Sequence, residues 1–163
     1  MIVTTQPEIP LQDLNKEMPS ACEAMFQVHE RLKVCAKRRG SKAESYDDFV
    51  TDIFRERADE VDTILTIIPP QGQCWTAFVH SGVVFIRPPL VGEWIDDEFK
   101  NTIVALLELA EEVLQCGRVV VCLEKKGEEL KTLVHAFMYI GFQLVTPDIY
   151  GYNDRFILVG YDI

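Results

Sequence analysis

Three glutamates, Glu108, Glu111 and Glu112, have the spacing that would let their side chains act together. An α-helix turns about 100° per residue, so residues three and four apart share one face. Lys100 falls alongside them, two turns earlier. Carboxylates grouped in this way either face water, as most charged helix faces do, or bind a basic surface through complementary charge. The spacing alone leaves both interpretations open, and Lys100 could simply neutralise the neighbouring glutamates.

The helix that carries the glutamates is predicted over residues 101–115, and acidic residues from Asp96 onward suit its first turn. Asn101 falls on the same face as Glu108 and Glu112. The opposite face is apolar and is expected to dock on a sheet. Its members are Phe99, Ile103, Leu106, Leu107, Ala110, Val113 and Leu114.

No other group of residues in the sequence has the pattern of a reaction centre. Nucleophilic catalysis needs a nucleophile beside a base, and no serine or cysteine has a signature context that involves His29, His80 or His135. A Cys/His hydrolase stays open as a minor alternative, because such partners meet in space rather than in sequence. Zinc and calcium ligand spacings and a glycine-rich phosphate loop are absent. We expect no catalytic activity, no cofactor and no metal.

The negative charge of the chain is uneven. The net charge is −10, and residues 91–163 hold 13 of the 26 acids but 6 of the 16 bases. A phosphate backbone needs a basic surface, so nucleic acid is excluded as a partner. A protein with a positive patch is favoured instead, because opposite charges steer association.

Cysteine usage and hydropathy indicate the compartment. The sequence has five cysteines, an odd number, and none of them forms a Cys-x-x-Cys pair. We therefore expect reduced thiols rather than the disulfide framework of a secreted protein. No segment has the pattern of a signal peptide or is apolar enough to span a bilayer. We expect a cytoplasmic protein, with the nucleus as a second location and no membrane partner.

The first 60 residues are predicted to form an extension. Residues 1–19 contain three prolines and predict a flexible N-terminal arm. Residues 20–60 predict a helical extension, with one helix between Ser20 and Gly40 and a second over 45–58.

Residues 61–163 are predicted to form a domain with a complete core of its own. Strands are expected at 62–68, 75–79, 83–87, 118–123, 142–146 and 155–161, and helices at 101–115 and 127–139. This order predicts an α/β (α+β) fold in which a mixed sheet is flanked by helices.

The segment from Trp75 to Tyr161 resembles ornithine decarboxylase antizyme, over a little more than half of the chain. The resemblance is carried by VVFIRPPL at 83–90, LLELAEE at 106–112, VVVCLEKKGEEL at 119–130 and FMYIGFQLVTP at 137–147. The last contains Phe-x-x-x-Gly-Phe-x-x-Val-x-Pro, which is the most specific of these patterns.

The resemblance implies a fold similar to that of the acyl-CoA N-acyltransferase superfamily, used without catalysis. It also implies an inhibitor that binds the ornithine decarboxylase monomer 1:1 and blocks homodimerisation. Such proteins pass the enzyme to the 26S proteasome without ubiquitin and restrain polyamine synthesis and uptake. Antizyme inhibitor is a further implied partner, and family members are usually expressed by ribosomal frameshifting.

Residue by residue, the resemblance implies a partner-binding set of Lys100, Glu108, Glu111, Glu112 and Val145. The chain departs from the family in the loop at 147–154, which is less basic than expected. It also departs in residues 1–60, which match no family pattern. Because the family's degradation signal lies upstream of its binding domain, the resemblance does not extend to that signal.

Two alternatives stay open. An acyl-CoA-dependent N-acetyltransferase would share the element order, but its pyrophosphate needs amide donors and positive potential at a helix N-terminus. The sequence has Glu93, Asp96, Asp97 and Glu98 at that place. The other alternative is an acidic adaptor for some other basic protein.

Overall fold

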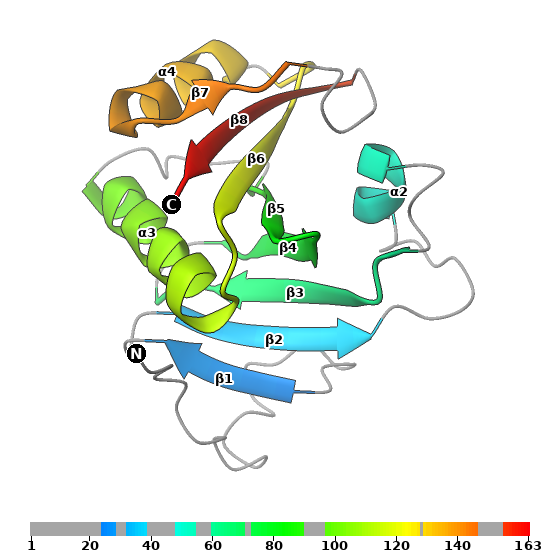
Figure 1. Cartoon of the computed structure of the whole chain (residues 1–163). Helices are drawn as coiled ribbons and strands as arrows, with labels where there is room; N and C mark the ends of the chain where they lie inside the picture. Colours follow the sequence, from blue (N-terminus) through cyan, green and yellow to red (C-terminus); the bar gives the residue numbers. More distant parts are fainter. Residues whose placement is uncertain are drawn as a thin grey trace.

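The computed structural model describes residues 24–28, 32–38, 48–54, 60–70, 73–89, 97–127, 129–146 and 155–163. Within these ranges the chain forms one eight-stranded sheet with helices packed against it (Figure 1). The strands are β1 (Ala24–Val28), β2 (Leu32–Arg38), β3 (Thr63–Ile68), β4 (Trp75–His80), β5 (Val83–Arg87), β6 (Arg118–Glu124), β7 (Gln143–Leu144) and β8 (Phe156–Asp162). The helices are α2 (Asp48–Phe54), α3 (Asp97–Glu108) and α4 (Leu130–Ile140), and the π-helical turn η3 (Leu109–Val113) extends α3.

The sheet is mixed, as the order of predicted elements indicates. Its strand order is β1-β2-β3-β4-β5-β6-β8-β7. β5 and β6 are parallel, and the other neighbouring strands are antiparallel. A parallel pair needs a long crossover connection, which α3 and η3 provide. The predicted α+β fold, a mixed sheet flanked by helices, is confirmed.

Alternation along β6 shows that the sheet separates two hydrophobic cores. Val119 and Val121 belong to the first core, which contains the buried residues of α3 and α4. Val120 and Cys122 belong to the second core, which contains the buried residues of α2. Successive side chains of a strand point to opposite faces. α3 and α4 therefore cover one face of the sheet, called here the helix face, and α2 packs on the opposite face.

Aromatic rings fill the second core. The rings of Phe78 and Phe85, from adjacent strands, stack with centroids 5.0 Å apart. Two rings of α2 meet them edge-on: Phe49 lies 5.1 Å from Phe78, and Phe54 lies 5.1 Å from Phe85. Aromatic pairs in these geometries add to the stabilisation from burial alone. α2 is thus an integral part of the second core.

The prediction of a helix between Ser20 and Gly40 is wrong. β1 and β2 occupy this stretch as an antiparallel pair, and β2 pairs with β3 from Lys33↔Ile68 to Arg38↔Thr63. The composition suits a helix, but helix propensity is a weak prior that tertiary pairing overrides. Pairing with β3 and burial of the apolar side chains of β2 favour the strand.

Residues 61–163 do not contain a complete core, so that expectation is also wrong. Leu32 and Val34 of β2 are buried in the first core, and four residues of α2 are buried in the second. Within the predicted second helix at 45–58, the structure describes α2 over 48–54. The predicted arm, residues 1–19, lies outside the described residues, and the boundary between 60 and 61 stays a prediction.

Candidate functional site

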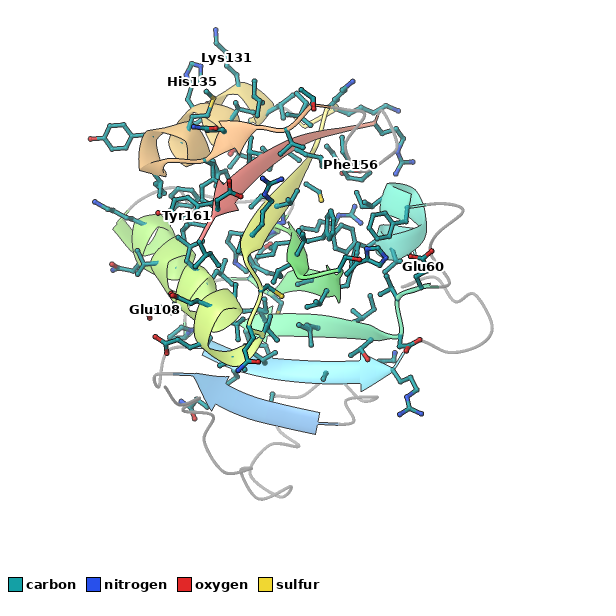
Figure 2. All side chains as sticks on the ribbon, viewed as in Figure 1. Glu60, Glu108, Lys131, His135, Phe156 and Tyr161 are labelled. Atoms are coloured by element: carbon teal, nitrogen blue, oxygen red, sulfur yellow. The ribbon has the colours of Figure 1, made fainter. Side chains whose placement is uncertain are left out.

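The acidic stripe is carried by α3 and η3. Lys100, Val104 and Glu108 follow one another at intervals of four residues along α3, so they share one face. Lys100 is exposed, Glu108 is half-buried, and the Val104 side chain is 39% exposed. Figure 2 shows Glu108 on the side of α3 that points away from the sheet. We call Lys100, Val104, Glu108, Glu111 and Glu112 the outer face of α3.

The opposite face of α3 docks on the sheet, as predicted. Phe99, Ile103, Leu106 and Ala110 are at most 6% exposed and belong to the first core. Phe99 contacts Phe137 of α4 edge-on, with ring centroids 5.2 Å apart. This packing fixes the rotation of α3 about its axis, so the polar side chains of the outer face must point away from the core.

The last turn of the helix differs from the continuous α-helix predicted over 101–115. The amide of Leu114 donates to the carbonyl of Leu109 at 3.0 Å, an i→i+5 bond that defines a π-helical turn. The amide of Cys116 then donates to the carbonyl of Ala110 at 2.8 Å. Gln115 has a φ of 55°, which ends the helix before Gly117. Such turns are frequently found at functional sites.

The π-helical turn changes the relation between the glutamates. A wider turn advances less than 100° per residue, so Glu112 comes closer to the line of Glu108 along the helix axis than an α-helical turn would allow. Glu111 is exposed, and Glu112 is half-buried. All three glutamates remain on the outer side of the helix, while Leu109 and Ala110 are buried.

Val145 lies on the other face of the sheet, apart from the outer face of α3. Its side chain packs against the second core, while Phe142, three residues earlier, is buried in the first. The amide of Val145 donates to the carbonyl of Leu158 at 2.9 Å, which extends the pairing of β7 with β8. The structure therefore groups four of the five predicted binding residues and separates Val145 from them.

A small groove lies beside Val145, with a volume of about 150 Å³. Its lining residues are Arg118, Gln143, Leu144, Val145, Thr146, Gly160 and Asp162. Arg118 Nε donates to Asp162 Oδ1 at 2.5 Å, which ties the start of β6 to the end of β8. This hydrogen bond lowers the pKa of the Asp162 carboxyl from its ordinary value. The groove thus combines an apolar wall with a mutually neutralising charged pair.

The described cysteines do not provide an activated thiol. Burial raises the pKa of the Cys122 thiol well above its ordinary range, although the Arg87 charge opposes this effect. Desolvation also raises the pKa of Cys74 and of Cys116. A nucleophilic cysteine needs a lowered pKa. Cys35 is disulfide-bonded, so the expectation of reduced thiols throughout is wrong at this position.

Thiol labelling of the native chain tests this arrangement. We expect Cys74, which is exposed, to react first with iodoacetamide at neutral pH. Cys116 and Cys122 are buried, so we expect them to be labelled only after unfolding, and Cys35 only after reduction as well. Peptide mapping by mass spectrometry reads each position. Rapid native labelling of Cys122 would contradict the packing of β6.

The two described histidines, His80 and His135, lie in different surroundings. His80 Nε2 lies 2.6 Å from Glu60 Oε1, and its ring meets that of Phe54 edge-on at 4.7 Å. His135 lies on the exposed side of α4 next to Lys131 (Figure 2).

Among the described residues, no three His, Cys, Asp or Glu side chains are arranged to hold a metal ion. No helix in the described part of the chain is long and apolar enough to cross a membrane.

Sequence reasoning missed two exposed apolar side chains at these sites. Val104 lies between Lys100 and Glu108 on the outer face of α3, and Leu144 is 58% exposed on β7. The spacing of Val104 from Lys100 and Glu108 could have identified it. Leu144 could not be identified in this way, because the pattern of a two-residue strand does not distinguish its faces.

Two solved structures are similar to this chain at low identity. The N-terminal domain of ribosomal-protein-alanine acetyltransferase from Clostridium acetobutylicum has a TM-score of 0.43 at 13% identity, over 85% of this chain and 95% of that one. A Bacillus subtilis acetyltransferase in complex with CoA has a TM-score of 0.43 at 13% identity, over 82% of this chain and 98% of that one.

Relatives in sequence include ornithine decarboxylase antizymes from several animals. Ornithine decarboxylase antizyme of Aedes aegypti is 44% identical over 90 residues, which are 54% of this chain and 37% of the relative. Antizyme 2 of Danio rerio is 36% identical and antizyme 1 of Xenopus laevis 32% identical, each over 73 residues that cover 45% of this chain and 33% of the relative. The chain thus aligns with about a third of the length of these relatives.

The shared region contains α3, η3, α4 and β7, the elements that carry both the outer face of α3 and the groove. The family model for ornithine decarboxylase antizyme matches residues 73–163. Because this match covers more than half of the sequence, the chain belongs to the ornithine decarboxylase antizyme family.

Proposed function

We propose that the chain inhibits ornithine decarboxylase without catalysing a reaction, by binding one subunit of the enzyme through the outer face of α3. The observation that carries this proposal is the grouping of Glu108, Glu111 and Glu112 on the exposed side of a helix whose opposite side is fixed in the core. Membership of the antizyme family supports the choice of partner.

The outer face of α3 suits a protein partner with a positive patch. Its glutamates would pair with basic side chains, while Val104 offers an apolar contact among them. Interfaces commonly combine apolar contacts with a polar rim. Charge complementarity mainly raises the association rate and specificity, so we expect binding to weaken as salt increases.

We extend the proposal to the effect of the chain on polyamine metabolism. A subunit held in a 1:1 complex could no longer form its homodimer, which would lower polyamine synthesis. Delivery to the 26S proteasome, restraint of polyamine uptake and binding of antizyme inhibitor are proposed by analogy with the family. So are expression by frameshifting and a cytoplasmic and nuclear location.

Size-exclusion chromatography with light scattering tests the proposed binding. We expect the purified chain to convert dimeric ornithine decarboxylase into a 1:1 heterodimer, with parallel loss of decarboxylase activity. Raising the salt from about 50 to 500 mM should weaken the complex, because the Debye length falls severalfold over this range. An enzyme that stays dimeric and active at excess chain would contradict the proposal.

Titration of the same preparation with acetyl-CoA distinguishes the acetyltransferase alternative. We expect no binding heat and no rise in melting temperature at millimolar acetyl-CoA. Acetylation of a polyamine, or stabilisation by acetyl-CoA, would favour the enzyme instead. Capture of other basic proteins with the same affinity would favour the adaptor.

A further inference from the structure

Val145 and its neighbour Leu144 have opposite environments at the edge of the sheet. Val145 is half-buried against the second core, whereas Leu144 is 58% exposed and belongs to neither core. Strand alternation places Leu144 on the same side as Phe142, which is buried in the first core with α3 and α4. Leu144 therefore lies on the helix face, and Val145 lies on the face away from α3.

Val145 is held against β8 by a close steric fit. A Cβ atom added to Gly160 would lie 3.0 Å from Cγ2 of Val145 and 3.7 Å from Cγ2 of Val120. The valine methyl thus occupies the space that any larger residue at position 160 would need. Together with the hydrogen bond from the Val145 amide to Leu158, this contact fixes where the short strand β7 lies.

The backbone of β7 has an open side within the described part of the chain. β7 is the last strand of the sheet, with β8 as its neighbour. Because Val145 bonds to β8, the intervening amide and carbonyl of Leu144 point away from it, as antiparallel pairing requires. An exposed apolar side chain beside outward backbone groups suits contact with a second protein.

We infer that Leu144 contacts the partner and that Val145 is a positioning residue, which fixes β7 over Gly160 so that Leu144 is presented correctly. This inference rests on the proposed function, and its occupant is the same ornithine decarboxylase subunit. A subunit bound to the outer face of α3 lies on the helix side of the sheet, which is also the side of Leu144. Val145 points to the other side and acts through β7.

A double-mutant cycle on the full chain tests the positioning role. Val145→Ala should leave a gap over Gly160, and Gly160→Ala should clash with the valine methyl. We expect each single change to weaken binding of ornithine decarboxylase roughly tenfold. The double variant should recover most of the affinity, because the alanine methyl at 160 refills the space. Val145→Ile retains the Cγ2 methyl and should bind like wild type.

Leu144→Ala tests the contact role, with Thr132→Ala on the exposed surface of α4 as the control. We expect Leu144→Ala to lower affinity roughly tenfold with an unchanged melting temperature, as truncation of a contact residue does. The control should match wild type. Normal binding by Leu144→Ala would contradict the contact role of Leu144. If, in addition, Val145→Ile binds weakly and the double variant does not regain affinity, then Val145 itself is the contact and the positioning role is wrong as well.

Amide hydrogen exchange of β7 and β8 separates this inference from the proposed function. In Val145→Ala the backbone amide of residue 145 should exchange faster than in wild type. In the double variant with Gly160→Ala this amide should exchange more slowly again. Both effects should appear whether or not ornithine decarboxylase is present. If wild-type chain fails to bind the enzyme, the proposed function and the contact role of Leu144 both fail. Unchanged exchange in Val145→Ala would overturn the positioning role alone.

Discussion

The double variant Glu108→Lys/Glu112→Lys is expected to abolish binding of ornithine decarboxylase while the chain stays folded. Both side chains lie on the outer face of α3, and the side that docks on the sheet is unchanged. Reversed charges would face the basic patch of the partner, and like-charge contacts at an interface cost several kcal/mol. A loss of about 3 kcal/mol corresponds to more than a 100-fold drop in affinity. Isothermal titration and circular dichroism measure the two effects.

The matched control changes the net charge equally, on elements other than α3 and η3. Asp62→Lys/Glu129→Lys reverses two exposed acids, one just before β3 and one at the start of α4. We expect this variant to bind within a fewfold of wild type, because screening weakens long-range effects of charge. Equal losses in both variants would mean that net charge, rather than the outer face of α3, controls binding.

Removal of residues 1–60 is expected to prevent folding of the remaining chain. The truncation deletes β1, β2 and α2, so β3 loses one of its two partners and the second core loses its cover. Phe78 and Phe85, now fully buried, would face water, and each exposed phenylalanine costs about 1.5–3 kcal/mol. For the two residues together this is about 3–6 kcal/mol, a large share of the roughly 5–15 kcal/mol that stabilises a whole domain.

Thermal unfolding and near-ultraviolet circular dichroism measure this loss. The full chain should unfold cooperatively, and residues 61–163 alone should show neither a sharp transition nor a near-ultraviolet signal. Two point variants separate the causes: Val34→Asp disrupts β2, and Ile53→Asp disrupts α2, since both residues are fully buried. Cooperative unfolding of the truncated chain would show instead that residues 61–163 fold as an independent domain.

The later part of the fold was predictable because its patterns are strong. The unbroken apolar run of β6 predicts a strand covered on both faces, and both of its cores are observed. The Ser81–Gly82 turn between the strands predicted at 75–79 and 83–87 has positive φ values at both residues, as a type I′ turn requires. The N-terminal hairpin was not predictable in this way, because its pairing with β3 joins segments far apart in sequence.

The helix face that carries the candidate residues could be predicted from spacing, but the arrangement of these residues in space could not. Helical spacing correctly placed Glu108, Glu111 and Glu112 opposite the docking face. The same reasoning could not show that Val145 lies across the sheet, because that depends on the register of β7 with β8. It also could not anticipate η3, since a π-helical turn leaves no regular period in the sequence.

The π-helical turn is a place where this helix can change its length by one residue. A wide turn fits one extra residue into nearly the same rotation about the helix axis, so deleting one residue within Leu109–Val113 would leave an ordinary turn with i→i+4 bonds. The apolar side of the helix would still dock on the first core. We therefore expect that related chains can differ by a single-residue gap here without turning the docking side of the helix away from the sheet.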